Sequence, residues 1–154
     1  HKSVEFIKNI EAIKESQIIP ITINQIENQT PNHKILLTFD DGGKSAMLIA
    51  DILEKHKWFG HFFITTSMIG SSTFLNKLDI KELFDRGHVI GSHSHNHKTP
   101  FRDLSIEEMT KEWSTSIDIL EQISKNFQVI TLQKFQPYRE NWFIYNYKIW
   151  SREH

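Results

Sequence analysis

The chain has 154 residues, a length that favours one domain with a single hydrophobic core. Its 38% hydrophobic and 24% charged residues are ordinary for a globular protein, and a net charge of −1 argues against nucleic acid or an anionic membrane surface as a partner. There is no cysteine, so disulfides and thiolate metal ligands are excluded, and any metal must be held by His, Asp or Glu.

The apolar positions predict helices and strands that alternate along the chain. Helices are predicted over residues 3–16, 44–56, 80–86 and 105–125, the last opening on a capping box formed by Ser105 and Glu108. Strands are predicted over residues 35–39, 60–66, 88–91 and 129–132. Residues 18–23 read as a short extended segment interrupted by Pro20, and residues 25–32 read as a loop.

This alternation predicts an α/β fold with a parallel sheet. Four strands are too few for an eight-stranded α/β barrel, which takes about 250 residues, so we expect an open sheet or an incomplete version of a larger domain. Three regions are expected: an N-terminal helix and linker (1–32), a core (33–134) and an aromatic-rich tail (135–154). From residue 138 onward the tail has no helical or alternating spacing, and no strand is predicted there.

Two carboxylates follow the first predicted strand, in the segment Thr38-Phe39-Asp40-Asp41-Gly42. Adjacent residues leaving a strand point to opposite sides, so one of Asp40 and Asp41 can bind a metal while the other acts as a general base. The alternative is a plain strand-to-helix turn in which an Asp caps the helix beginning near Lys44.

Three imidazoles follow the third predicted strand, at His93, His95 and His97. In a helical turn, the four-residue spacing of His93 and His97 would place two rings on one face, where both can reach one ion. The alternative is a solvated polar loop that is rich in histidine.

Together, the two clusters predict a metal centre. Both lie at the carboxyl ends of strands, where ligands collect in parallel α/β folds, and we expect them to lie side by side because one βα excursion separates them. One Asp and two His form a 2-His-1-carboxylate set with open coordination positions, which is typical of catalytic rather than structural sites.

The motifs Thr38-Phe39-Asp40-Asp41-Gly42 and His93-Ser94-x-x-His97 resemble those of the polysaccharide deacetylases, the NodB-homology or carbohydrate esterase family 4 enzymes. Residues 60–64 and 86–91 also resemble that family, and the resemblance covers roughly residues 33–125. It implies an incomplete, distorted (β/α) barrel of the NodB type and a divalent metal, most often zinc. The implied reaction is removal of acetyl groups from a sugar polymer.

The resemblance also assigns roles to individual residues. Asp40 matches the catalytic base, Asp41, His93 and His97 match the metal ligands, and Ser94 matches a position that steadies the loop. His95 falls at a variable position of the family motif. The implied partner is an acetylated polysaccharide, with no nucleic acid, and the implied location is outside the cytoplasm or at the cell envelope.

The C-terminal part departs from the family pattern. Phe135-Gln136-Pro137-Tyr138 is a weak match to the third family motif, which supplies oxyanion contacts and orients the base. The Leu-x-x-His segment that supplies the general acid is not found, and His154 is the only histidine after His97. The chain therefore reads as truncated relative to the family. No signal peptide or apolar run of about 18 residues is visible either.

These departures leave two other functions open. The chain could be an impaired remnant that binds metal or sugar without turnover. It could also be a related amidohydrolase acting on a small non-sugar amide. Three further residues, His61, His88 and Trp58, are expected to be structural, and the charges at 107–112 are expected to form a solvated helix face.

Overall fold

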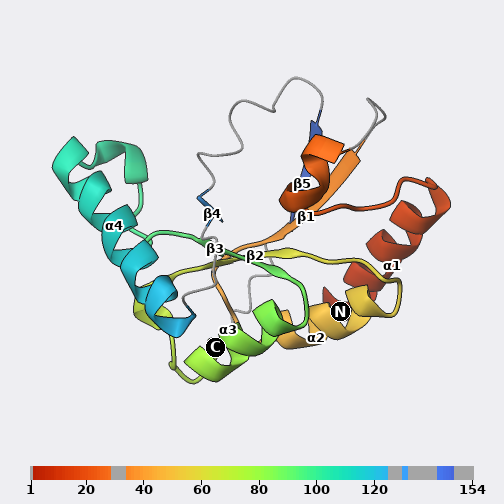
Figure 1. Cartoon of the computed structure of the whole chain (residues 1–154), viewed down its shortest axis with the longest axis horizontal. Coiled ribbons are helices and arrows are strands. Elements are labelled where there is room, and N and C mark those ends of the chain that lie inside the picture. Colours follow the sequence, from red (N-terminus) through yellow and green to blue (C-terminus); the bar gives the residue numbers. More distant parts are fainter. Residues whose placement is uncertain (1, 29–33, 125–129, 132–141, 148–154) are drawn as a thin grey trace.

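The structure, a computed structural model, describes residues 2–28, 34–124, 130–131 and 142–147 (Figure 1). Its centre is a five-stranded sheet in the order β4-β3-β2-β1-β5, in which every neighbouring pair is parallel. The strands are β1 (Lys34–Phe39), β2 (His61–Ile64), β3 (Val89–Ser92), β4 (Ile130–Thr131) and β5 (Trp142–Tyr147). In the described residues β4 and β5 form the two edges, so the sheet is not closed.

Four α-helices flank this sheet, as the alternating pattern predicts. They are α1 (Lys2–Glu15), α2 (Ser45–Glu54), α3 (Lys77–Asp85) and α4 (Ile106–Ile123). Short 3-10 helices occur at η1 (Ile23–Asn28), η2 (Thr66–Met68) and η3 (Phe101–Asp103). The capping box expected at α4 is present: the Ser105 side chain accepts from the Glu108 amide, and the Glu108 carboxylate accepts from the Ser105 amide.

Two sequence predictions about secondary structure are wrong. β5 lies in the tail for which no strand was predicted, and it pairs with β1 over all six residues. The segment predicted as a loop over 25–32 begins instead as η1, because the Thr22 amide donates to the Gln25 side chain and starts a tight turn. The extended segment around Pro20 is confirmed by a parallel bridge to Ile35.

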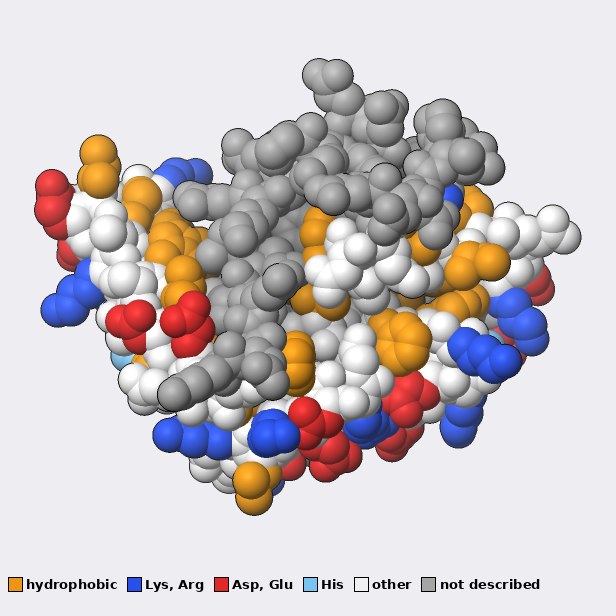
Figure 2. Space-filling view, viewed as in Figure 1, with side chains coloured by type: hydrophobic (Ala, Val, Ile, Leu, Met, Phe, Trp, Pro, Cys, Tyr) orange, Lys and Arg blue, Asp and Glu red, His pale blue; other side chains and the backbone are white. Residues whose placement is uncertain are grey.

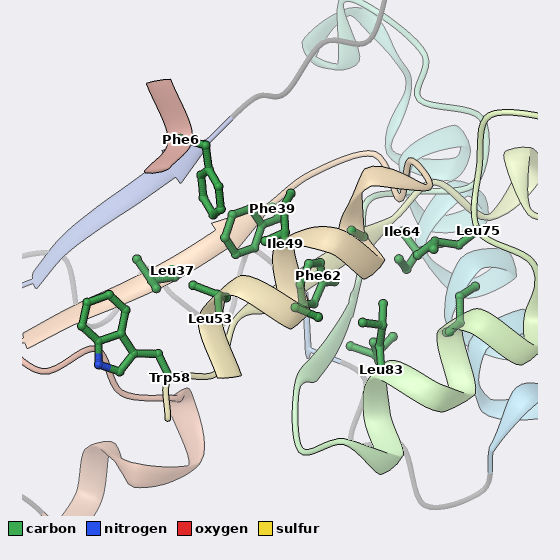
Figure 3. Close-up of a cluster of buried hydrophobic side chains, with 14 of the residues drawn as sticks. Phe6, Leu37, Phe39, Ile49, Leu53, Trp58, Phe62, Ile64, Leu75 and Leu83 are labelled. Carbon is green, nitrogen blue, oxygen red and sulfur yellow. The ribbon is translucent and has the colours of Figure 1, made fainter. Parts of the chain in front are cut away.

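The larger part of the hydrophobic core lies between the sheet and helices α1, α2 and α3 (Figure 3). β1 can be covered on both faces because alternate side chains point to opposite sides. Leu37 and Phe39 face this core, while Leu36 faces a smaller cluster on the other side with Ile21 and Phe63. Phe39 stacks on Phe62 with ring centroids 5.0 Å apart, which joins β1 to β2.

His61 and Trp58 are buried in this framework, as expected. The Ile23 amide donates to Nε2 of His61 at 3.0 Å, so the ring proton lies on Nδ1, which donates to the Leu37 carbonyl at 3.0 Å. Burial lowers the pKa of His61 to about 4, so the ring is neutral at pH 7. Trp58 is 7% exposed and packs in the core.

His88 is also structural and hydrogen-bonds to an ion-pair cluster that joins α2 to α3. The Gly60 amide donates to its Nδ1 at 3.1 Å, so its Nε2 donates to Glu54 Oε1 at 2.9 Å, and Arg86 contacts the same oxygen at 2.7 Å. Arg86 also pairs with Asp51 at 2.6 Å and with Glu82 at 3.3 Å. Hydrogen bonding from Arg86 holds the pKa of Glu54 below its ordinary value. Acidic and basic side chains are interspersed along the lower edge of the molecule in the space-filling view (Figure 2).

None of the helices in the described ranges is long and apolar enough to cross a membrane.

Candidate metal centre

The first half of the site is a tight turn at the carboxyl end of β1. Asp41 has φ of 74° and Gly42 has φ of 81°, so two consecutive residues adopt the left-handed conformation. The turn is fixed from outside, because the Leu75 amide donates to the Gly42 carbonyl and the Lys44 amide donates to the Thr73 carbonyl, both at 2.9 Å. The backbone therefore reverses at Asp41 instead of continuing the strand.

The second half of the site is the loop at residues 93–97, which follows β3. The loop is not the helical turn in which the four-residue spacing was considered, because Ser94 and His97 have φ of 66° and 51°. The His97 amide donates to the Ser94 hydroxyl at 3.1 Å, which closes the loop on itself. The imidazoles of His93 and His97 still lie close, with ring centroids 4.8 Å apart, because the loop rather than a helix brings them together.

The two clusters lie close together as expected, but not because a single βα excursion separates them: β1 and β3 are not neighbours. Two βα units separate the clusters, so β2 lies between them and pairs with both strands. The end of β2 bridges the gap: the Thr65 amide donates to the Asp41 carbonyl at 3.3 Å, and the Thr66 amide donates to the Ser94 carbonyl at 3.3 Å. The His93 amide in turn donates to the Ile64 carbonyl at 2.9 Å.

Asp41, His93 and His97 come together above the end of β2. Asp41 Oδ1 lies 3.3 Å from His93 Nε2 and 3.5 Å from His97 Nε2, and one ligand atom from each residue lies within 4.8 Å of the others. The side chain of His93 is 15% exposed, whereas those of Asp41 and His97 are about one-third exposed. The group is therefore open to solvent on one side.

These three residues fit a divalent ion. Two ligands that each bind zinc at about 2.1 Å with a tetrahedral angle lie about 3.4 Å apart, which is close to the separations of Asp41 from the two imidazoles. Among the described residues, His93 Nε2 is buried and has no hydrogen-bond partner, a costly state for a polar atom unless a ligand completes it. A carboxylate and two imidazoles suit zinc and neighbouring divalent metals, and they leave coordination positions open.

Asp40 and His95 lie outside this three-residue cluster. Asp40 is half-buried, and its Oδ1 is a buried atom without a hydrogen-bond partner in the structure. The Nδ1 of His95 forms a hydrogen bond with the Thr66 hydroxyl at 3.0 Å, which ties this ring to η2. The segment Phe135–Tyr138 and His154, where further family motifs were sought, lie outside the described residues.

Glu112 was expected on a solvated helix face, and that expectation is wrong. Glu112 is 5% exposed and points from α4 to the loop at 93–97, where its carboxylate accepts hydrogen bonds from the His95 and Asn96 amides. Burial opposes its ionisation, but the hydrogen bonds from Asn96 and His95 outweigh it and hold the pKa of Glu112 below its usual value.

The helix carries a signal that could have revealed this residue. The buried positions of α4 are Glu112, Ser116 and Leu120, which are four residues apart and so lie on one face of the helix. This face is polar at one end because it packs against the histidine loop rather than against an apolar surface.

Comparison with known proteins identifies the family and supports the fold. Residues 27–145 match the polysaccharide deacetylase family. The structure resembles that of IcaB from Ammonifex degensii, with a TM-score of 0.71 and 18% identity over 91% of this chain and 73% of that chain. It also resembles the Streptococcus pyogenes deacetylase PplD, with a TM-score of 0.67 and 23% identity over 78% of this chain and 56% of that chain.

The fold is thus an incomplete (β/α) barrel of the NodB type, with parallel strands and flanking helices. The chain belongs to the polysaccharide deacetylase family. Among curated proteins, it is 37% identical over 70 residues to the peptidoglycan-N-acetylmuramic acid deacetylase PdaA of Bacillus subtilis. That match covers 44% of this chain and 25% of the relative, so the chain spans only a part of the relative's length.

Proposed function

We propose that this chain removes acetyl groups from an N-acetylated polysaccharide by metal-dependent hydrolysis. Asp41, His93 and His97 bind the ion, for which zinc is the best candidate, and Asp40 is the catalytic base. The observation that carries the proposal is the convergence of the three ligand atoms at the carboxyl edge of the sheet, where His93 Nε2 is buried and has no hydrogen-bond partner in the described part of the chain.

A divalent ion held there would lower the pKa of a water molecule toward neutrality and act as a Lewis acid toward a carbonyl oxygen. Asp40 supplies the complementary function, because its buried Oδ1 has no hydrogen-bond partner within the described ranges and can accept a proton from the attacking water. Water adds to the acetyl carbonyl, the C–N bond breaks, acetate is released and the sugar nitrogen leaves as an amine after it gains a proton.

The substrate class rests on the family and on the curated relative. PdaA is described as a peptidoglycan-N-acetylmuramic acid deacetylase, and we propose a related acetylated cell-wall glycan for this chain. A substrate of that kind also favours action at the cell envelope. The open side of the cluster, where Asp41 and His97 are about one-third exposed, suits a polymer that approaches from solvent.

The test is acetate release from N-acetylglucosamine oligomers by the wild-type chain and by Asp40→Asn. Loss of the base should lower turnover by about 10²- to 10⁴-fold, while metal stoichiometry stays near one ion per chain. Asp118→Asn is the matched control, because this exposed residue of α4 undergoes the same change away from the site. Unchanged turnover in Asp40→Asn would refute the role of the base. A wild-type chain that binds metal but releases no acetate would indicate binding without turnover.

A further inference from the structure

The loop that carries the two histidine ligands is in a conformation that needs support. Ser94 and His97 both have positive φ, which costs a non-glycine residue about 1–2 kcal/mol. Two such residues within four positions persist only where surrounding contacts outweigh this cost. The orientation of His93 and His97 toward Asp41 therefore depends on whatever holds the loop in place.

The η2 amides of Thr66 and Ser67 donate to the carbonyls of this loop, and Glu112 supports the loop from the other side of its backbone hydrogen-bonding groups by accepting from its amides. Its Oε2 accepts hydrogen bonds from the backbone amides of His95 at 3.1 Å and Asn96 at 2.6 Å, and its Oε1 accepts from the Asn96 side-chain amide at 2.8 Å. Each of these three hydrogen bonds has a charged acceptor, so each is stronger than a hydrogen bond between neutral groups. They bind the tip of the loop, midway between the two ligands.

The helix that presents Glu112 is itself fixed to β3. Ser116, one turn further along α4, accepts a hydrogen bond from the Ser92 hydroxyl at 2.7 Å, and both serines are fully buried. Leu120, one more turn along, is also fully buried in the core. Glu112 therefore acts from a rigid element and can fix the loop rather than follow it.

We propose that Glu112 is a positioning residue that holds the loop at 93–97 so that His93 and His97 reach one ion together with Asp41. The proposal rests on the metal set of the proposed function and deepens it. Glu112 is not one of the three candidate ligands. Its effect passes through the backbone of His95 and Asn96, which lie between the ligands in the chain.

The proposal predicts weaker metal binding when the carboxylate is removed. Glu112→Ala leaves two backbone amides and the Asn96 side chain without their acceptor, so the loop can relax away from its left-handed conformation. Loss of a supporting contact of this kind lowers metal affinity by about 10- to 100-fold. In Glu112→Gln the amide oxygen can still accept from the backbone, so we expect a smaller loss of about two- to tenfold.

The experiment measures Zn²⁺ affinity by competition with a chromogenic chelator, and the Co²⁺ absorption spectrum, for the wild-type chain, Glu112→Ala, Glu112→Gln and Glu121→Gln. Circular dichroism without metal corrects each affinity for the folded fraction. Glu121 is the matched control, because it is an exposed glutamate on the same helix. The expected order of affinity is wild type equal to Glu121→Gln, then Glu112→Gln, then Glu112→Ala, with an altered Co²⁺ spectrum in the two Glu112 variants.

Metal binding by the wild-type chain and by the Glu112 variants separates failure of this inference from failure of the proposed function. A folded wild-type chain that binds neither Zn²⁺ nor Co²⁺ would contradict the metal set and this inference with it. A wild-type chain that binds, together with Glu112 variants of unchanged affinity and spectrum, would overturn the role of Glu112 alone. If Glu112→Ala does not fold, Glu112→Gln decides: an affinity and spectrum equal to those of the wild type would overturn the proposal.

Discussion

The turn that carries Asp41 should tolerate alanine at Gly43 but not at Gly42. Gly42 has φ of 81°, and a Cβ at this position would lie 3.1 Å and 3.2 Å from side-chain atoms of Ile64, which is 1% exposed. The left-handed conformation costs alanine about 1–2 kcal/mol. Forcing a methyl group against a buried side chain adds about 1–2 kcal/mol.

Gly42→Ala should therefore destabilise the fold by about 2–4 kcal/mol, which for a chain of this length lowers Tm by about 5–15 °C. Gly43→Ala is the matched control. Its φ is not left-handed, and the nearest atoms to its Cβ lie at 3.8 Å, an ordinary contact distance. We expect a stability within about 1 kcal/mol of the wild type for this variant.

The assay is thermal unfolding of both variants without metal, followed by Zn²⁺ titration. Gly42→Ala should also bind the ion more weakly, because a shifted turn moves the carboxylate of Asp41. Equal Tm values for the two variants would refute the left-handed turn as the feature that directs Asp41.

The remaining predictions concern buried polar groups near the sheet. The pKa of His61 is about 4 in the folded state, against an ordinary 6.5. As pH falls below 6.5, the unfolded chain therefore binds a proton that the folded chain does not. The free energy of unfolding should fall by about 3 kcal/mol as pH drops from 6.5 toward 4. His61→Gln, which can keep both hydrogen bonds without titrating, should show a shallower decline in urea unfolding across that range; an unchanged slope would contradict the assignment. Ser92→Ala and Ser116→Ala should each cost about 1–3 kcal/mol, and the double variant should cost about 1 kcal/mol less than their sum. Strict additivity would show that the two hydroxyls do not interact.

Much of the fold could be predicted from the sequence, because local signals agree with the tertiary structure. The apolar run 35–39 becomes β1, buried on both faces, and Ser105 with Glu108 caps α4 as expected. β5 could not be predicted in this way. Its residues, Trp142–Tyr147, lack an alternating pattern, and what defines the strand is its pairing with β1, which is more than a hundred residues earlier.

The site could be predicted in composition but not in geometry. Residue type and position at strand ends predicted two imidazoles with one of the two carboxylates, and the family resemblance implied that this carboxylate is Asp41. The structure brings Asp41, His93 and His97 together. The conformation of the loop at 93–97 could not be predicted from the spacing of its histidines, because positive φ at Ser94 depends on contacts from other elements. Glu112 was missed for the same reason, since only the packing of α4 on the loop shows that this charge is buried.

The most direct test of the metal site is the anomalous scattering of a crystal of this chain soaked in Zn²⁺. We predict one strong peak at about 2.0–2.2 Å from Asp41 Oδ1, His93 Nε2 and His97 Nε2 together. A crystal with no peak among these atoms, or with its zinc bound at residues elsewhere in the chain, would contradict the account.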